Sequence, residues 1–255
     1  MKTLTQKSRR GVRAVLALVL SVAGVLGANT PAQAACRQAL AIGLDVSGSV
    51  DATEYRLQMD GLAAALLTGD VQAAFLAMPD INVRLLVYEW GGDDSQNLLV
   101  PWTEITSSDD LQAVAQTLRS TQRQAARLST ALGQAMLFGA DALANQTDCW
   151  RRTIDLSGDG ESNSGPRPRS VSDDPAFFGV TINAIVIGAD ALPYSDISQS
   201  EIAQLSSYFR SEVIRGPNAF VETAIEFVGF QDAMAKKLLK ELQTRAVGRL
   251  VPPDQ

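Results

Sequence analysis

The sequence predicts a doubly wound α/β fold, in which a mostly parallel six-stranded sheet carries helices on both faces. Apolar, strand-like runs alternate with amphipathic helical segments along the chain from about residue 39, a pattern typical of parallel strands joined by helical crossovers. Residues 81–90 and 97–105 are separated by six residues that include the turn signal 91–94, which predicts a hairpin and one antiparallel edge strand.

Each element follows from its local pattern. Short apolar runs bounded by turn residues predict strands at residues 39–45, 81–90, 97–105, 151–157, 181–187 and 219–224. Asp51 and Glu54 form a capping-box pattern before a helix that places Tyr55, Met59 and Leu62 on one face. Further helices are predicted from Ser107 to about residue 119, and at 130–144, 201–209 and 230–246. The last is amphipathic, with its Lys and Glu residues expected in solvent. The stretch 161–174, rich in Ser, Pro, Arg and Asp, is expected to be a surface loop.

The first 34 residues have the build of a secretory signal peptide. Basic residues precede an apolar run at 14–26, and residues 32–34 form an A-x-A site, so we expect the mature chain to begin near Ala35. Residues 35–255 then form a single domain. The apolar run is short for a membrane span, which needs about 20 residues, and we expect no membrane insertion after cleavage. Arg9-Arg10 hints at twin-arginine export, but the following residues favour the Sec route, to the periplasm or the exterior.

Charge and composition exclude several classes of function. Removing the five basic residues of the leader from the formal balance of −6 leaves −11, so nucleic acid is not an expected partner. The chain contains no histidine, which excludes Ser-His-Asp and Cys-His catalysis and most zinc chemistry. Two cysteines in an exported protein favour one disulfide.

Oxygen-bearing side chains follow the first strand and recur at two later points. Asp45, Ser47 and Ser49 form an Asp-x-Ser-x-Ser sequence, Thr130 opens a helix, and Asp159 follows the fourth strand. Ligands of open α/β sheets bind at the carboxyl ends of the strands, and hard divalent cations prefer oxygen ligands. An isolated Asp-x-Ser-Gly-Ser is more simply a turn and helix cap; the three segments together predict a metal site.

This arrangement resembles the von Willebrand factor A (vWA) domain family and its metal-ion-dependent adhesion site (MIDAS), over residues 38–246. Residues 154–160 and Pro101-Trp102 resemble more narrowly an exported bacterial branch, DUF1194. The resemblance implies that Ser47, Ser49 and Thr130 bind the ion directly, and that two further ligands act partly through water; these are Asp45 and Asp159. Ser129 is an alternative to Thr130, which the helix register favours. It also implies the strand order 3-2-1-4-5-6.

The predicted cofactor is Mg²⁺, with Mn²⁺ as a possible substitute. Two carboxylates and three hydroxyls carry less charge than a calcium cage usually does, and Mg²⁺ tolerates retained waters. The family resemblance implies an open coordination position that takes an acidic residue of a partner protein. We therefore expect an exported, non-enzymatic adhesion or scaffold module. The alternatives are a metal-assisted hydrolase, which the lack of an accompanying base disfavours, and a structural domain with a vestigial site.

The cysteines are predicted to pair with each other. Cys36 precedes Asp45 by nine residues and Cys149 precedes Asp159 by ten, and the strands that end near these aspartates are parallel neighbours in the expected fold. Equal steps back along paired strands keep two chains side by side, about 4.8 Å apart. A disulfide can bridge that separation, at the end of the sheet opposite the metal.

Overall fold

The computed structural model describes residues 36–124, 128–188 and 196–243. Within them lies a six-stranded sheet in the order β3-β2-β1-β4-β5-β6, as predicted. Neighbouring strands are parallel except for the β2–β3 pair, which is antiparallel. The strands are β1 (Cys36–Asp45), β2 (Val83–Trp90), β3 (Gln96–Ile105), β4 (Cys149–Gly158), β5 (Val180–Ile187) and β6 (Val221–Ala224).

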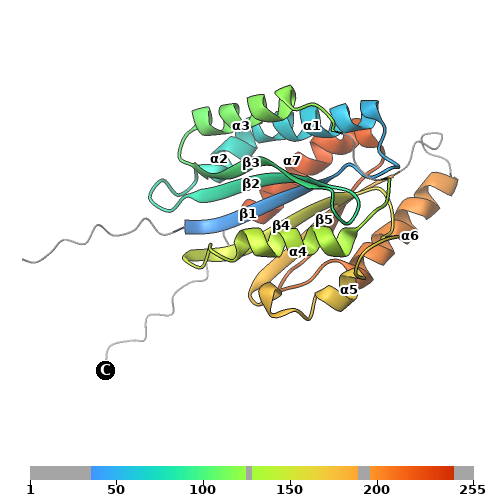
Figure 1. Cartoon of the computed structure of the whole chain (residues 1–255). Helices are drawn as coiled ribbons and strands as arrows, with labels where there is room; N and C mark the ends of the chain where they lie inside the picture. Colours follow the sequence, from blue (N-terminus) through green and yellow to red (C-terminus); the bar gives the residue numbers. More distant parts are fainter. Residues whose placement is uncertain (1–35, 125–127, 189–195, 244–255) are drawn as a thin grey trace, which may run out of the picture. The chain divides into compact units, whose positions relative to one another are not determined.

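Helices cover both faces of this sheet (Figure 1). One face carries α1 (Ala52–Leu66), α2 (Gly69–Phe75), α3 (Ser108–Ser120) and α7 (Phe230–Leu242); the other carries α4 (Leu132–Leu143), α5 (Pro168–Val171) and α6 (Asp196–Glu212). Two short 3₁₀ helices, η1 (Pro175–Phe177) and η2 (Phe227–Gly229), precede β5 and α7. The two faces hold separate apolar cores, because alternate residues of each strand point to opposite sides.

The capping-box prediction for α1 is confirmed. The Asp51 carboxylate accepts hydrogen bonds from the N–H groups of Thr53 at 2.6 Å and Glu54 at 2.8 Å, and the Glu54 carboxylate accepts from Asp51 N–H at 2.6 Å. Tyr55, Met59 and Leu62 are buried along the face that packs on the sheet. This cap fixes where the chain turns from the loop after β1 into the helix.

Several boundaries differ from the predictions. The helix α2 was not predicted, α6 is longer than 201–209, and α4 begins two residues after Thr130. A short helix, α5, lies within the stretch expected to be loop. The predicted signal peptide and residues 244–246 of the closing helix lie outside the described residues. Among the described residues, no helix has both the length and the hydropathy to cross a membrane.

The prediction that the charged residues of the last helix lie in solvent is wrong for two of them. Lys236 and Lys240 are exposed, but Lys237 and Glu241 are buried against the sheet. Lys237 Nζ forms ion pairs with Asp155 of β4 and with Glu241, the latter at 2.7 Å. The amphipathic pattern of the helix could not reveal this burial, because Asp155, which pairs with Lys237, is distant in sequence.

The predicted disulfide is confirmed. Cys36 and Cys149 stand opposite each other at the amino ends of β1 and β4, with their Cα atoms 4.2 Å apart, and they form the bridge. The bridge links residues 113 positions apart in the sequence. It joins the two central strands at the end of the sheet opposite Asp45 and Asp159.

Candidate metal centre

The loop after β1 holds three of the predicted ligands in one turn. Ser47 N–H donates to Asp45 Oδ1 at 2.8 Å, and the hydroxyls of Ser47 and Ser49 are 3.3 Å apart. The glycine between the serines is required: a Cβ at Gly48 would lie 2.5 Å from the Leu128 carbonyl oxygen, to which Gly48 N–H donates at 3.1 Å. The Asp-x-Ser-Gly-Ser loop can therefore pack closely against the segment that precedes α4.

Asp159 joins this loop from the end of β4. Ser49 Oγ donates to Asp159 Oδ1 at 2.7 Å, a contact between residues separated by 110 positions in the sequence. The neighbouring pairing of β1 with β4 brings their carboxyl ends together and so accounts for the approach. Four of the five predicted residues thus form one connected cluster.

Thr130 is held through its backbone by the loop that follows Asp159. Its N–H donates to Asn163 Oδ1 at 2.8 Å, and its carbonyl accepts from Asn163 N–H at 2.9 Å. Thr130 is only 5% exposed. In the described part of the chain, no hydrogen bond joins its hydroxyl to the other four residues. Its position comes from the contact of Leu128 with Gly48 and from the loop that follows Asp159.

The predictions missed the residues that hold Asp45 in place. Asp45 N–H donates to Ser157 Oγ at 3.0 Å, and Gln58 Nε2 donates to the Asp45 carbonyl at 2.8 Å. Ser157 in turn donates to Gln58 Oε1. The role of Gln58 could have been predicted from the sequence, since it is a polar residue on the otherwise apolar face of α1. The pairing of Asn163 with Thr130 corresponds to no such pattern in the sequence.

The electrostatics of the cluster favour a cation. Burial, and to a smaller extent the nearby Asp159 carboxylate, raises the pKa of Asp45 to about 8. Burial also raises the pKa of Asp159. Asp45 Oδ2 is buried without a hydrogen-bond partner. Among the described residues, no lysine or arginine forms an ion pair with either aspartate. A divalent ion would balance both carboxylates and occupy the unpartnered oxygen, so the residues fit such a group.

The donor set is rich in hydroxyls rather than carboxylates. No group of three or more His, Cys, Asp or Glu side chains within the described ranges is arranged to hold a metal ion. The candidate centre has only two carboxylates, and its remaining oxygens come from Ser47, Ser49 and Thr130. Such a set suits a hard ion that keeps waters in its shell.

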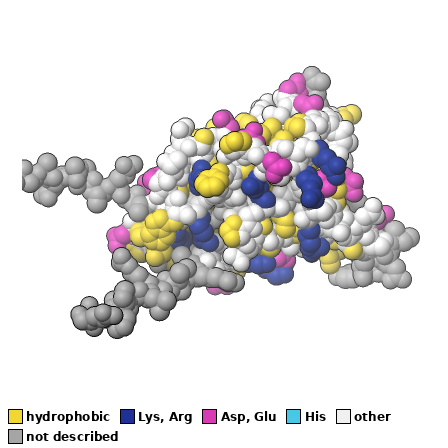
Figure 2. Space-filling view, turned by 90° about the horizontal axis from the view of Figure 1, so that it is seen from below, with side chains coloured by type: hydrophobic (Ala, Val, Ile, Leu, Met, Phe, Trp, Pro, Cys, Tyr) yellow, Lys and Arg dark blue, Asp and Glu magenta, His cyan; other side chains and the backbone are white. Residues whose placement is uncertain are grey.

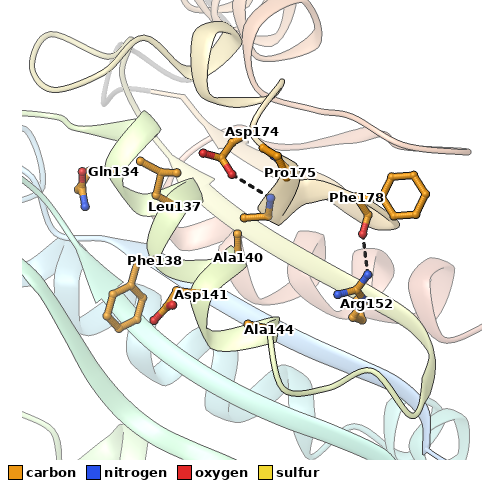
Figure 3. Close-up of a pocket in the computed structure, with 11 residues that line it drawn as sticks. Gln134, Leu137, Phe138, Ala140, Asp141, Ala144, Arg152, Asp174, Pro175 and Phe178 are labelled. Atoms are coloured by element: carbon orange, nitrogen blue, oxygen red, sulfur yellow. Dashed lines mark hydrogen bonds between the residues drawn. The ribbon is translucent and has the colours of Figure 1, made fainter.

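A large surface cavity lies away from the candidate metal centre. It has a volume of about 710 Å³ between α4 and η1, and Figure 3 shows its lining residues from Gln134 to Phe178. Two of its polar groups are already bound: Asp174 accepts from Ala176 N–H, and Arg152 donates to the Phe178 carbonyl. Figure 2 shows hydrophobic, basic and acidic side chains intermixed on this face. None of the five candidate ligands lines this cavity.

The family described as "Protein of unknown function (DUF1194)" matches residues 35–246. The chain belongs to this family. The resemblance to the DUF1194 branch that the motifs indicated is thereby confirmed. No curated protein matches the chain.

Solved structures, a von Willebrand factor type A protein among them, share this fold at low sequence identity, which confirms the vWA-type fold. Proximal thread matrix protein 1 from the mussel byssus, with a zinc-occupied MIDAS motif, aligns with a TM-score of 0.54 and 15% identity over 82% of this chain and 46% of that one. The pilus adhesin SpaC of Lactobacillus rhamnosus GG aligns with a TM-score of 0.56 and 14% identity, over 82% of this chain and 31% of that one. A von Willebrand factor type A protein of Catenulispora acidiphila aligns with a TM-score of 0.51 and 13% identity, over 81% of this chain and 43% of that one. The chain spans less than half the length of these structures.

Proposed function

We propose that this protein is an exported, non-enzymatic binding module that uses a divalent ion to recognise an acidic residue of a partner protein. Asp45, Ser47, Ser49, Thr130 and Asp159 would hold the ion. The observation that carries the proposal is Asp45 Oδ2, which is buried without a partner beside a second carboxylate. A buried carboxylate that lacks a compensating cation is costly, so the arrangement favours an ion from solution.

A bound divalent ion supplies a positive centre that can accept a further oxygen ligand. The two protein carboxylates and the ion have formal charges that cancel, so an approaching carboxylate is no longer repelled. The residues of this chain orient the ligands: Ser157 and Gln58 fix the Asp45 backbone, and Asn163 fixes that of Thr130. Mg²⁺ fits the donor set best. The zinc-occupied MIDAS motif of the mussel protein makes zinc a second ion to test.

Export is part of the proposal. The disulfide between Cys36 and Cys149 suits an oxidising compartment, which supports the periplasm or the exterior as the location. In this proposal the predicted signal peptide directs export by the Sec route.

Titration calorimetry with Mg²⁺, Mn²⁺ and Zn²⁺ tests the site. We expect the wild type to bind one ion, Asp45→Ala to bind none, and Thr130→Ala to bind more weakly. Ser129→Ala is the matched control, because this neighbouring hydroxyl is the alternative ligand. Equal binding by the wild type and Asp45→Ala would place the ion elsewhere and refute the assignment.

Capture of a protein partner tests recognition. Envelope proteins of the source organism should be retained by the immobilised protein in Mg²⁺, released by EDTA, and not retained by Thr130→Ala. Capture that survives both EDTA and this substitution would mean that another surface binds. The metal-assisted hydrolase remains the alternative, and turnover of generic phosphatase, esterase or peptidase substrates that is lost in Asp45→Ala would favour it.

A further inference from the structure

A second cavity adjoins the candidate metal centre on the side toward α6. Its volume is about 300 Å³. It lies between the loop after β4, the end of β5 and the first half of α6. The lining residues are Asp159, Gly160, Glu161, Ile187, Gly188, Glu201, Ile202, Gln204 and Leu205. Because Asp159 belongs both to this cavity and to the metal centre, whatever binds the ion lies next to the cavity.

Close contacts between α6 and the strand ends hold the walls of this cavity in place. A Cβ at Gly188 would lie 2.3 Å from the Ile225 carbonyl oxygen and 2.5 Å from Ile202 Cδ1, so only glycine permits this approach. Ser162 N–H donates to the Tyr208 hydroxyl at 3.2 Å, which ties the loop after β4 to α6. The cavity is therefore formed by packed elements.

The cavity combines an apolar lining with acidic residues. Ile187 is buried, and Ile202 and Leu205 are half-buried. Glu161 and Glu201 are exposed, and within the described ranges neither forms an ion pair. With Asp159, three carboxylates line the cavity, and the proposed ion would balance only Asp159. Among the described residues, the negative charges of Glu161 and Glu201 thus have no ion-pair partner.

These carboxylates do not form a second metal site. The described residues contain no group of three or more His, Cys, Asp or Glu arranged to hold an ion. A partner group that fills the apolar part of the cavity and also places a positive charge beside Glu161 or Glu201 at the exposed rim has a long apolar stem and a charged end. Lys and Arg side chains have this build, since their methylene groups pack on apolar surface while the charge stays at the rim.

We propose that this cavity binds a Lys or Arg side chain of the partner, next to the acidic residue that binds the ion. The partner's recognition surface is then a carboxylate paired with an adjacent cation, and a partner that presents only acidic residues is repelled by Glu161 and Glu201. This inference rests on the proposed function, because it assumes that a carboxylate binds at the metal centre.

A displayed peptide library tests the proposal. The library carries a fixed central Glu with random residues on both sides, and it is selected on the purified protein in Mg²⁺, with a parallel selection in EDTA. We expect binding that requires Mg²⁺, with Lys and Arg enriched beside the fixed Glu. Peptides bound in Mg²⁺ without this enrichment would overturn the cavity assignment and leave the proposed function standing. Capture that is equal in Mg²⁺ and EDTA would overturn both.

Charge variants test whether Glu161 and Glu201 cause the preference for Lys and Arg. The double variant Glu161→Gln/Glu201→Gln should keep Mg²⁺-dependent capture but lose the enrichment, and it should bind the selected basic peptides about two- to fivefold more weakly for each carboxylate removed. The matched control is Asp70→Asn/Asp80→Asn, which changes the net charge equally at exposed residues outside the cavity. An equal loss in both double variants would assign the preference to net charge and refute the proposal.

Discussion

Two buried aspartates on neighbouring strands have opposite electrostatic surroundings. Asp45 ends β1 and Asp155 lies in the middle of β4, and both are essentially inaccessible to solvent. Asp155 pairs with the ammonium group of Lys237 from α7. Asp45 instead faces Asp159, and no described lysine or arginine pairs with it.

This difference indicates that Asp155 stabilises the fold, whereas Asp45 belongs to the candidate metal centre. The Lys237 ion pairs, together with Asn183 Nδ2 donating to Glu241 at 2.6 Å, form a network in which a lysine of the chain balances buried carboxylates. Asp155 Oδ2 and Asp45 Oδ2 are both buried without a hydrogen-bond partner, so the lysine is what distinguishes the two aspartates. Among the described residues, no lysine or arginine forms an ion pair with Asp45 or Asp159, and the Arg123 guanidinium at this loop donates to the carbonyls of Val46 and Ser47. The cluster lies at the carboxyl ends of β1 and β4, where ligands reach open α/β folds. An aspartate buried without a lysine or arginine therefore marks the candidate site better than burial alone.

The largest expected change in stability comes from removing the disulfide, and it tests whether the stabilisation by Mg²⁺ is independent of that bridge. Replacing both cysteines, Cys36→Ser with Cys149→Ser, removes a bridge across 113 residues of sequence and should lower the free energy of unfolding by about 4–5 kcal/mol. Because the bridge lies at the far end of the sheet, the increment that Mg²⁺ adds should persist. Urea denaturation with and without Mg²⁺ measures both quantities. Loss of the Mg²⁺ increment would mean that the metal centre depends on the disulfide.

Removing the cation from Asp155 should be nearly as damaging. Lys237→Met leaves two carboxylates buried without a lysine and should destabilise the protein by about 3–5 kcal/mol. Lys236→Met is the matched control, since Lys236 is exposed and pairs at the surface with Glu222; its loss should change stability by about 0–1 kcal/mol. Equal effects in urea denaturation would contradict a structural role for the buried pair.

Adding the ion should stabilise only a protein with an intact Asp45. Free Mg²⁺ at a hundredfold excess over its Kd should raise the wild-type free energy of unfolding by about 2.7 kcal/mol, because the ion binds the folded state alone. Asp45→Ala should not respond, and EDTA should reverse the gain. Thermal melts across an Mg²⁺ series provide the measurement, and a full response in Asp45→Ala would exclude this residue as a ligand.

The smallest expected effect distinguishes the two aspartates most clearly, because their substitutions should change stability with opposite signs. In EDTA, Asp45→Asn should stabilise the protein by about 1 kcal/mol, since it removes a carboxyl group whose ionisation is disfavoured by burial and by the nearby Asp159 carboxylate. Asp155→Asn should destabilise it by about 1–3 kcal/mol, since it weakens the bond to Lys237. Destabilisation by both substitutions, measured in urea, would abolish the distinction drawn between them.

Much of the fold could be predicted from periodicity and turn residues. The alternation of apolar runs, the hairpin turn before β3 and the capping box of α1 are local patterns, and each corresponds to an element of the structure. The helix α2 was missed because it is short and follows α1 after only two residues. Residue spacing also indicated the disulfide, since it follows from equal steps along two parallel strands.

The candidate site was less completely predictable. Asp45, Ser47, Ser49, Thr130 and Asp159 stand out as a motif, but their supports do not. Ser157, Gln58 and Asn163 act through hydrogen bonds to backbone atoms, and such roles require no particular pattern along the chain. The acidic cavity beside Asp159 likewise combines residues of three separate elements.

The sequence alone determined the strand order, the motif residues and the pairing of the cysteines, because these depend on local periodicity, on residue type and on the family that the motifs resemble. Only the tertiary structure decided which charges are compensated. Lys237 belongs to a helix whose pattern predicts exposure, yet packing on β4 places it beside Asp155. Asp45 and Asp159 meet because β1 and β4 are neighbours. Compensation of a buried charge depends on distances between strands and helices far apart in sequence, which no local pattern encodes.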